Sequence, residues 1–470
     1  MISISILIPF TFNVKNHPYQ YVYFNELQGG VKNAYKYYET DYSCNGVLAG
    51  SEWLIENVLA NREEEQILKI ATNYSPAAKE YFSGFSEQTE LQYTRYYEKS
   101  KRNWDYAVYY CAYISAYQLQ NNLWPPKGTI YTKEVGGFPI AAVVKRVSHE
   151  DYEGFEALKK RRLPEAKQHF RNFLALYPES EEVLEGYSRA FLMERNLDST
   201  LYYADQSLAY NPRQMGALLL KASALNTKKE YNEALIVANE MSEIKSDFPE
   251  GLFQKGFALK NLNQPNEALK AFQQAIAHKK DYNQAYLQMG EILINYKNYK
   301  KAIDIYDQLL KESPNDLYAK AYKAKSLQLS GDNIQAESII NSLPAANQNN
   351  VEVVKVKCRI ALAKNDLATA ANFINMARFI NNDADLFALR AKFVLAQNNR
   401  PQAEAFLKQA AELDPINREV QELMKLAQPA GGPQITQQAA GDQAKTKEQQ
   451  SVMFQKPKPK KTSPIAFPKR

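Results

Sequence analysis

The sequence predicts a mainly α-helical protein: a superhelix of about eight helical hairpins with a capping helix, preceded by a small α/β domain and followed by a disordered tail. Three observations predict this arrangement. From about residue 147, small residues recur every 34 positions. Residues 1–146 lack this period and contain all three tryptophans and 18 of the 32 tyrosines. Residues 428–470 are rich in Gln, Ala, Gly, Pro and Lys without periodicity, a composition that buries too little apolar surface to fold.

The N-terminal domain, residues 1–146, mixes helix and strand patterns. Residues 1–12, MISISILIPFTF, are apolar but lack the basic region and cleavage site of a signal peptide and are shorter than the roughly 20 residues of a membrane span. They predict a buried strand, or the end of a membrane helix that begins outside this reading frame. EWLIENVLAN (52–61) has helical spacing. Strands are predicted at 66–73, at 103–113, and in a hairpin at 129–135 and 138–146 that turns at Gly136 and Gly137.

Part of this domain resembles a family of membrane enzymes. HPYQYVYFNELQGGVKNAY (17–35), followed by YETDY, resembles the segment just after the last membrane helix in bacterial family 39-type, ArnT-like glycosyltransferases, which use lipid-linked sugar donors. WDYAVYY (104–110) resembles a later strand of the same extracytoplasmic domain. The resemblance implies a location at the cell envelope, membrane-associated or extracytoplasmic, with the cytoplasm as the alternative. The catalytic membrane region of those enzymes has no counterpart here, so Asp41 is not assigned a catalytic role.

The repeats, residues 147–427, begin near residues 147, 181, 215, 249, 283, 317, 351 and 384. Each carries a small residue in its expected second helix: Ala166, Thr200, Ala234, Ala268, Ala302, Ala336, Ala370 and Ala403. Twelve residues earlier stands another small residue, as at Gly154, Gly256 and Gly290, and four residues later a large one, as at Phe170, Phe272 and Tyr306. Small residues on both helices allow close approach, and a proline follows the second helix in several units. The unit is therefore helix, turn, helix.

This pattern resembles the tetratricopeptide repeat family, most clearly in the units that contain residues 251–281 and 285–316. Thr200 departs from the usual alanine, and SLPAANQNN (342–350) predicts a short second helix in the sixth unit. Residues 417–427 predict a capping helix. The resemblance implies a non-catalytic scaffold that binds a partner peptide or protein in a concave groove lined by the first helices. The alternative is the soluble extracytoplasmic portion of a membrane glycosyltransferase.

The candidate groove residues are the inward positions of the first helices. They are Phe253, Phe257, Lys260, Leu287, Glu291, Ile294, Tyr318, Lys325, Gln328, Lys355, Arg359 and Lys392. This series runs from apolar to basic, so we expect an extended or helical peptide whose acidic end lies toward the C-terminal repeats. The alternative for any one position is a solvated or inter-repeat packing residue.

No enzymatic chemistry is predicted. The sequence has no glycine-rich phosphate loop, nucleophile elbow or paired-cysteine zinc motif, and His17, His149, His169 and His278 show no metal-ligand spacing, so no cofactor or metal is expected. The cysteines, Cys44, Cys111 and Cys358, are expected to be small buried residues. The tail carries eight basic and two acidic residues and so accounts for the net charge of +6. It predicts at most an electrostatic tether to a membrane and no specific nucleic-acid binding.

Overall fold

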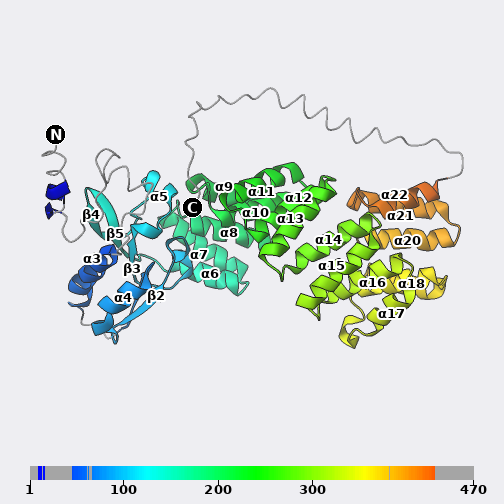
Figure 1. Ribbon diagram of the computed structural model, residues 1–470, viewed down its shortest axis with the longest axis horizontal. Helices are drawn as coiled ribbons and strands as arrows, with labels where there is room; N and C mark the ends of the chain where they lie inside the picture. Colours follow the sequence, from blue (N-terminus) through cyan, green and yellow to red (C-terminus); the bar gives the residue numbers. More distant parts are fainter. Residues whose placement is uncertain are drawn as a thin grey trace, which may run out of the picture. The chain divides into compact units, whose positions relative to one another are not determined.

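A computed structural model describes residues 9–12, 14–15, 45–60, 62, 66–379 and 382–428 (Figure 1). Residues 17–35, Asp41, Cys44 and the tail from residue 429 lie outside the described residues, so the predictions that concern them stay predictions. Contacts divide the chain after Ser326 into two compact units, which are described separately below. The first contains the α/β domain and the first hairpins, and the second contains the remaining hairpins.

The α/β domain is built on a five-stranded mixed sheet with the order β2-β1-β3-β5-β4. The strands are β1 (Leu68–Thr72), β2 (Thr89–Tyr93), β3 (Tyr106–Tyr110), β4 (Thr129–Val135) and β5 (Phe138–Lys145). β1 runs parallel to both β2 and β3, whereas β5 pairs antiparallel with β3 and β4. Gly136 and Gly137 take positive φ values of 60° and 79° at the turn between β4 and β5, as the predicted hairpin requires.

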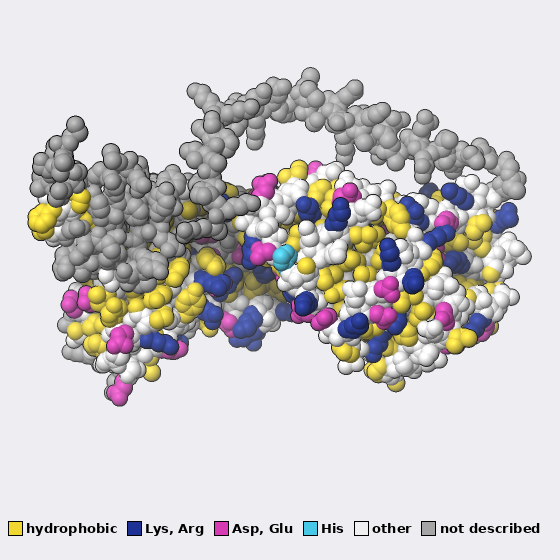
Figure 2. Space-filling model, viewed as in Figure 1, with side chains coloured by type: hydrophobic (Ala, Val, Ile, Leu, Met, Phe, Trp, Pro, Cys, Tyr) yellow, Lys and Arg dark blue, Asp and Glu magenta, His cyan; other side chains and the backbone are white. Residues whose placement is uncertain are grey.

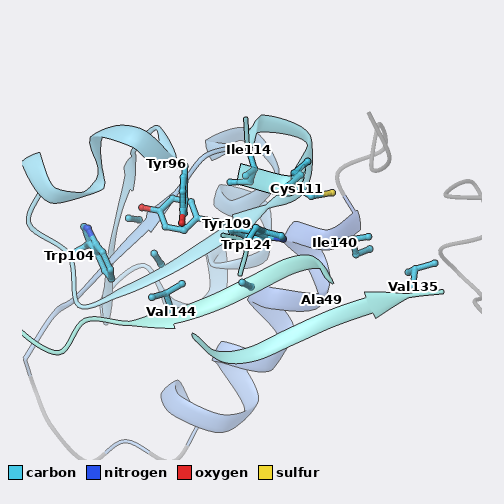
Figure 3. Packing of buried hydrophobic residues seen from close by; sticks show 14 residues of the cluster. Ala49, Tyr96, Trp104, Tyr109, Cys111, Ile114, Trp124, Val135, Ile140 and Val144 are labelled. Atoms are coloured by element: carbon cyan, nitrogen blue, oxygen red, sulfur yellow. The ribbon is translucent and has the colours of Figure 1, made fainter. Parts of the chain in front are cut away.

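Each face of the sheet has its own apolar cluster. Because strand side chains alternate, β3 directs Val108 and Tyr110 into the cluster covered by α3 (Asn45–Leu54) and α4 (Ser75–Tyr81). A short π-helical segment, Ile55–Leu59, extends α3. β3 places Ala107 and Tyr109 in the opposite cluster (Figure 3). Near that second face lie the 3₁₀ segments η5 (Tyr96–Lys101) and η6 (Cys111–Tyr113) and the short helix α5 (Ala116–Gln120).

The described residues after this domain form eight helical hairpins and a final helix, which confirms the predicted fold class. The first helices are α6 (Glu150–Lys159), α8 (Glu181–Met193), α10 (Met215–Thr227), α12 (Pro249–Asn261), α14 (Asn283–Asn295), α16 (Leu317–Leu329), α18 (Val351–Ala363) and α20 (Ala384–Ala396). The second helices are α7 (Leu163–Leu176), α9 (Leu197–Tyr210), α11 (Tyr231–Ile244), α13 (Pro265–His278), α15 (Tyr299–Glu312), α17 (Asn333–Asn341), α19 (Leu367–Arg378) and α21 (Arg400–Leu413).

Close packing within each hairpin follows from the predicted pairing of small and large residues. All eight repeating small residues, from Ala166 to Ala403, are 0% exposed. A Cβ atom added at Gly256 would lie only 2.7 Å from the ring of Phe272, and one added at Gly290 only 2.2 Å from the ring of Tyr306. A side chain therefore does not fit at these glycines unless the facing ring moves.

The short second helix of the sixth unit and the capping helix, both expected from the sequence, are visible as local structure. Helix α17 has nine residues, and a 3₁₀ turn at Ala345–Asn347 follows it. The Gln348 amide closes this region by donating to the carbonyl oxygens of Ile340 and Leu343, at 3.0 and 2.8 Å. At the end of the array, α22 (Arg418–Ala427) buries Val420 and Leu423 against α20 and α21, as a capping helix does.

Candidate functional site

The predicted groove residues of the first unit lie on α12, α14 and α16, and we call Phe253, Phe257, Lys260, Leu287, Glu291, Ile294, Tyr318 and Lys325 the first-helix face. The side chains of Phe253, Phe257, Leu287 and Ile294 are half-buried, and Tyr318 is 47% exposed. Phe253 packs against Phe257 and Tyr282, with ring centroids 6.3 and 5.2 Å apart. Each of these apolar side chains therefore packs partly against the core and leaves the rest of its surface exposed on this face.

Polar side chains of this face link one first helix to the next. The Lys260 ammonium on α12 donates to Gln288 Oε1 at 2.9 Å and pairs with Glu291 Oε2 on α14 at 2.5 Å. One repeat earlier, the Asn226 amide on α10 donates to Gln254 Oε1 on α12 at 2.8 Å. These contacts hold neighbouring repeats together. Lys260 and Glu291 therefore already pair with each other within the chain, and a bound partner would contact a pair that also stabilises the fold.

The second unit contains the other predicted groove residues, and two of them are not available at its surface. Lys355 is 2% exposed and Arg359 is 3% exposed. Lys355 pairs with Glu352 at 2.8 Å and with Asp383 at 2.5 Å. The prediction that these two side chains contact an acidic partner directly is therefore not supported, because carboxylates of the same unit already neutralise them. Gln328 is half-buried and stays a prediction.

Arg359 is the centre of an ion network that joins three helices. Its guanidinium binds Glu419 on α22 through two hydrogen bonds of 2.8 and 2.9 Å and also pairs with Asp385 on α20. Lys392 on α20 pairs with the same Glu419. Asp385 and Glu419 are 34 residues apart, so an acidic residue recurs at the same position in the first helix α20 and in the capping helix α22. That recurrence is the signal from which the sequence could have predicted the network.

The charges of this network stabilise one another in their ionised forms. Burial by itself raises the pKa of a carboxyl, but at Glu419 the charge and hydrogen bonds of Arg359, together with Lys392, outweigh burial and lower the pKa. Burial likewise disfavours the charged form of Lys355, yet Asp385, Glu352 and Asp383 hold its pKa above the ordinary value. The basic end of the predicted groove is thus internally neutralised.

A histidine that showed no ligand spacing in the sequence lies in an acidic environment in the first hairpin. His169 Nδ1 on α7 lies 2.6 Å from Glu150 Oε2 and 3.5 Å from Glu153 Oε2 on α6, and the three groups could hold a metal ion. Asn172 also donates to Glu150, at 3.2 Å. These hydrogen bonds and ion pairs already explain the arrangement. Cys111 and Cys358 are buried, as predicted, and burial raises the pKa of Cys358 to about 12.

On the visible face of the repeats, Lys and Arg side chains are interspersed with Asp and Glu (Figure 2). Within the described ranges, no helix combines the length and the apolar character that a membrane span requires.

Comparison with known proteins identifies the class of the repeats. The tetratricopeptide repeat family matches two overlapping segments, residues 262–326 and 297–360, which together include the helices from α13 to α17 and most of α18. Residues 262–360 therefore contain tetratricopeptide repeats. No curated protein matches the chain. None of the matches supports the resemblance of the N-terminal segment to ArnT-like glycosyltransferases.

Several solved structures are similar to the repeat array. A tetratricopeptide repeat protein from Parabacteroides merdae shows 20% identity over 53% of this chain and 98% of that chain, with a TM-score of 0.45. The Thermus thermophilus protein TTC0263 shows 19% identity over 37% of this chain and 95% of its own, with a TM-score of 0.33. YrrB, described as a TPR protein with an unusual peptide-binding site, shows 16% identity over 42% and 97%, with a TM-score of 0.33.

Proposed function

We infer that this protein is a non-catalytic scaffold that binds an extended segment of a partner protein along the first-helix face. Tetratricopeptide repeats bind peptide or protein partners, and stacked helical repeats create extended binding surfaces. The observation that carries the proposal is the row of half-buried and exposed apolar side chains on consecutive first helices, with Phe257 on α12, Ile294 on α14 and Tyr318 on α16. Rigid side chains of this kind bury area on binding at little cost in conformational entropy.

The partner segment is expected to carry apolar side chains that contact Phe257, Ile294 and Tyr318. An acidic end is no longer part of the proposal, because the carboxylates around Lys355 and Arg359 leave no unneutralised basic site at these residues. The first-helix face as defined above has two basic residues, Lys260 and Lys325. Lys260 pairs with Glu291, and the Lys325 ammonium lies 5.9 Å from the ring centre of Tyr322.

A library of random twelve-residue peptides displayed on phage and selected on the full-length protein tests this proposal. Peptides rich in aromatic and aliphatic residues should be enriched, and they should lose at least tenfold in affinity for the double variant Ile294→Glu, Tyr318→Glu. Ile236→Glu, at a 60% exposed position on the second helix α11, is the matched control and should bind as the unchanged protein does. If the selected peptides bind the double variant with unchanged affinity, the first-helix face is not the binding surface.

The glycosyltransferase alternative and a location at the cell envelope stay predictions from the sequence. Their main motif, residues 17–35, lies outside the described residues, and no observation favours them over the scaffold. The same holds for membrane association through residues 1–12 or the tail.

A further inference from the structure

Three metal-ligating side chains converge in the first hairpin, whose helices α6 and α7 lie side by side (Figure 1). Glu150 and Glu153 stand three positions apart in the first turn of α6, so they project from the same side of that helix. His169 faces them from the middle of α7. One imidazole nitrogen and two carboxylate oxygens, all within 4.8 Å of one another, are thus positioned by two helices. Spacing along the sequence does not reveal this cluster, because the ligands belong to different helices.

The distances among the three ligand atoms suit a single small divalent cation. His169 Nδ1 lies 3.5 Å from Glu153 Oε2, which is close to the separation of about 3.3 Å between two ligand atoms on one tetrahedral zinc ion. The same Nδ1 lies 2.6 Å from Glu150 Oε2, so this pair must open by about 0.7 Å to admit the ion. The Glu150 side chain is 29% exposed, and a small rotation toward water provides that movement.

Hydrogen bonds account for the positions of the three groups but not for their charge. Among the described residues, His169 is the only cationic partner of Glu150 and of Glu153. A protonated imidazole neutralises at most one of the two carboxylates, and a neutral imidazole neutralises neither. A divalent cation bound by both carboxylates and by the imidazole nitrogen neutralises both.

Hydrogen bonds from outside the cluster orient the Glu150 carboxylate. Its Oε1 accepts from the Asn172 amide at 3.2 Å, while its Oε2 faces His169. Gln168 donates to Asn172 Oδ1 at 2.9 Å, which directs the amide nitrogen of Asn172 toward Glu150. Carboxylates that bind metal ions in proteins are typically oriented by such neighbouring hydrogen bonds.

We propose that Glu150, Glu153 and His169 bind one zinc ion that links α6 to α7. An imidazole nitrogen suits zinc, whereas magnesium and calcium prefer oxygen ligands alone. Three protein ligands leave a fourth position on the ion for water, which can reach this partly exposed cluster. The first-helix face lies on α12, α14 and α16, so this inference does not depend on the proposed peptide binding.

Isothermal titration of the full-length protein with zinc chloride, in a buffer without chelators, tests the proposal. The unchanged protein should bind zinc saturably and should bind magnesium about tenfold more weakly or worse. His169→Asn keeps an amide nitrogen near the position of Nδ1 and can still donate to Glu150, but it should lower the affinity for zinc about tenfold or more. Glu153→Gln should lower it similarly. His278→Asn, at an exposed position at the end of α13, is the matched control and should bind zinc as the unchanged protein does.

Two further measurements separate this site from adventitious zinc binding. Zinc should raise the urea midpoint of the unchanged protein and of His278→Asn but not that of His169→Asn, because a ligand of the folded state stabilises it. In NMR spectra of the histidine rings, zinc should shift the signal that His169→Asn removes and leave the signal that His278→Asn removes. The proposal is overturned if zinc does not bind saturably, if His169→Asn and His278→Asn bind it alike, or if the His169 signal does not move.

Discussion

At the scale of single residues, Tyr306 places an unpaired hydroxyl in the core of its hairpin. Tyr306 is 0% exposed, its hydroxyl has no hydrogen-bond partner among the described residues, and its ring fills the space above Gly290. The equivalent positions of two other repeats carry Phe170 and Phe272, which fill the same space without a hydroxyl. Tyr306→Phe should therefore raise the free energy of unfolding, by about 1 kcal/mol, because it removes an unpaired buried hydroxyl and keeps the packing.

Urea unfolding followed by circular dichroism measures this effect. The control is Tyr202→Phe, at a 58% exposed position of α9, which should leave the unfolding midpoint almost unchanged. A lower midpoint for Tyr306→Phe would show that the hydroxyl has a partner, such as an ordered water molecule, and would contradict the interpretation.

At the scale of elements, the repeating hairpins were predicted from the sequence, whereas the turns that connect their helices were not. The hairpins were predictable because every unit needs small residues where its two helices touch, and all eight are fully buried. The turn between the two helices was not predicted in detail. Its left-handed residue also recurs every 33 or 34 positions, at Arg161, Arg195, Lys229, Asn263, Lys297, Gly331, Asn365 and Asn398. Only Gly331 is a glycine, so the other seven turns lack the glycine that usually identifies a left-handed residue at the end of a helix.

The predicted groove was only partly correct for a related reason. Helical spacing places Arg359 on the inward side of its first helix, but its burial depends on Glu419, which is 60 residues away in the sequence. The edge strand β2 was also missed: TELQY alternates polar and apolar residues but spans only five residues, and its place in the sheet comes from its pairing with β1. Contacts between distant segments decide both cases, and local patterns do not report them.

The ion network around Arg359 makes the stability of the second unit depend on pH. The pKa of Glu419 is lowered in the folded chain relative to an ordinary glutamate value of about 4.3. The carboxylate therefore contributes its full stabilisation above that ordinary value, and the contribution is lost as the pH falls toward the lowered pKa. Glu419→Gln should reduce the dependence of the unfolding midpoint on pH between about 5 and 3.

At pH 7 the same substitution should destabilise the second unit by about 3 kcal/mol, because it leaves the buried Arg359 with a weaker partner. Urea midpoints at several pH values, followed by hydrogen exchange in α18 and α22, measure both effects. Glu412→Gln, at an exposed position of α21, serves as the control. A pH profile of Glu419→Gln that parallels that of the unchanged protein would exclude a role for this carboxylate.

At the scale of the whole molecule, the α/β domain and the first hairpins share a buried charge. Glu182 on α8 is 1% exposed, and it accepts hydrogen bonds from the Lys99 ammonium and, at 3.1 Å, from the backbone N–H of Ser100 in η5. Gln118 of α5 donates to the neighbouring Glu181 at 3.3 Å. Since these contacts would be lost if either part unfolded alone, the two parts should unfold as one cooperative unit.

Glu182→Gln tests this cooperativity in the full-length protein. The neutral amide weakens the interaction with Lys99, so hydrogen exchange should accelerate together in β3 and in α8, although the two are more than 70 residues apart. Glu194→Gln is the control: Glu194 pairs with Lys167 at 2.7 Å within the first two hairpins, and its loss should accelerate exchange only near α7 and α8. Faster exchange in α8 with unchanged protection of β3 in Glu182→Gln would mean that the sheet is stable without the repeats. Joint acceleration would instead show that the repeats complete the fold of the α/β domain.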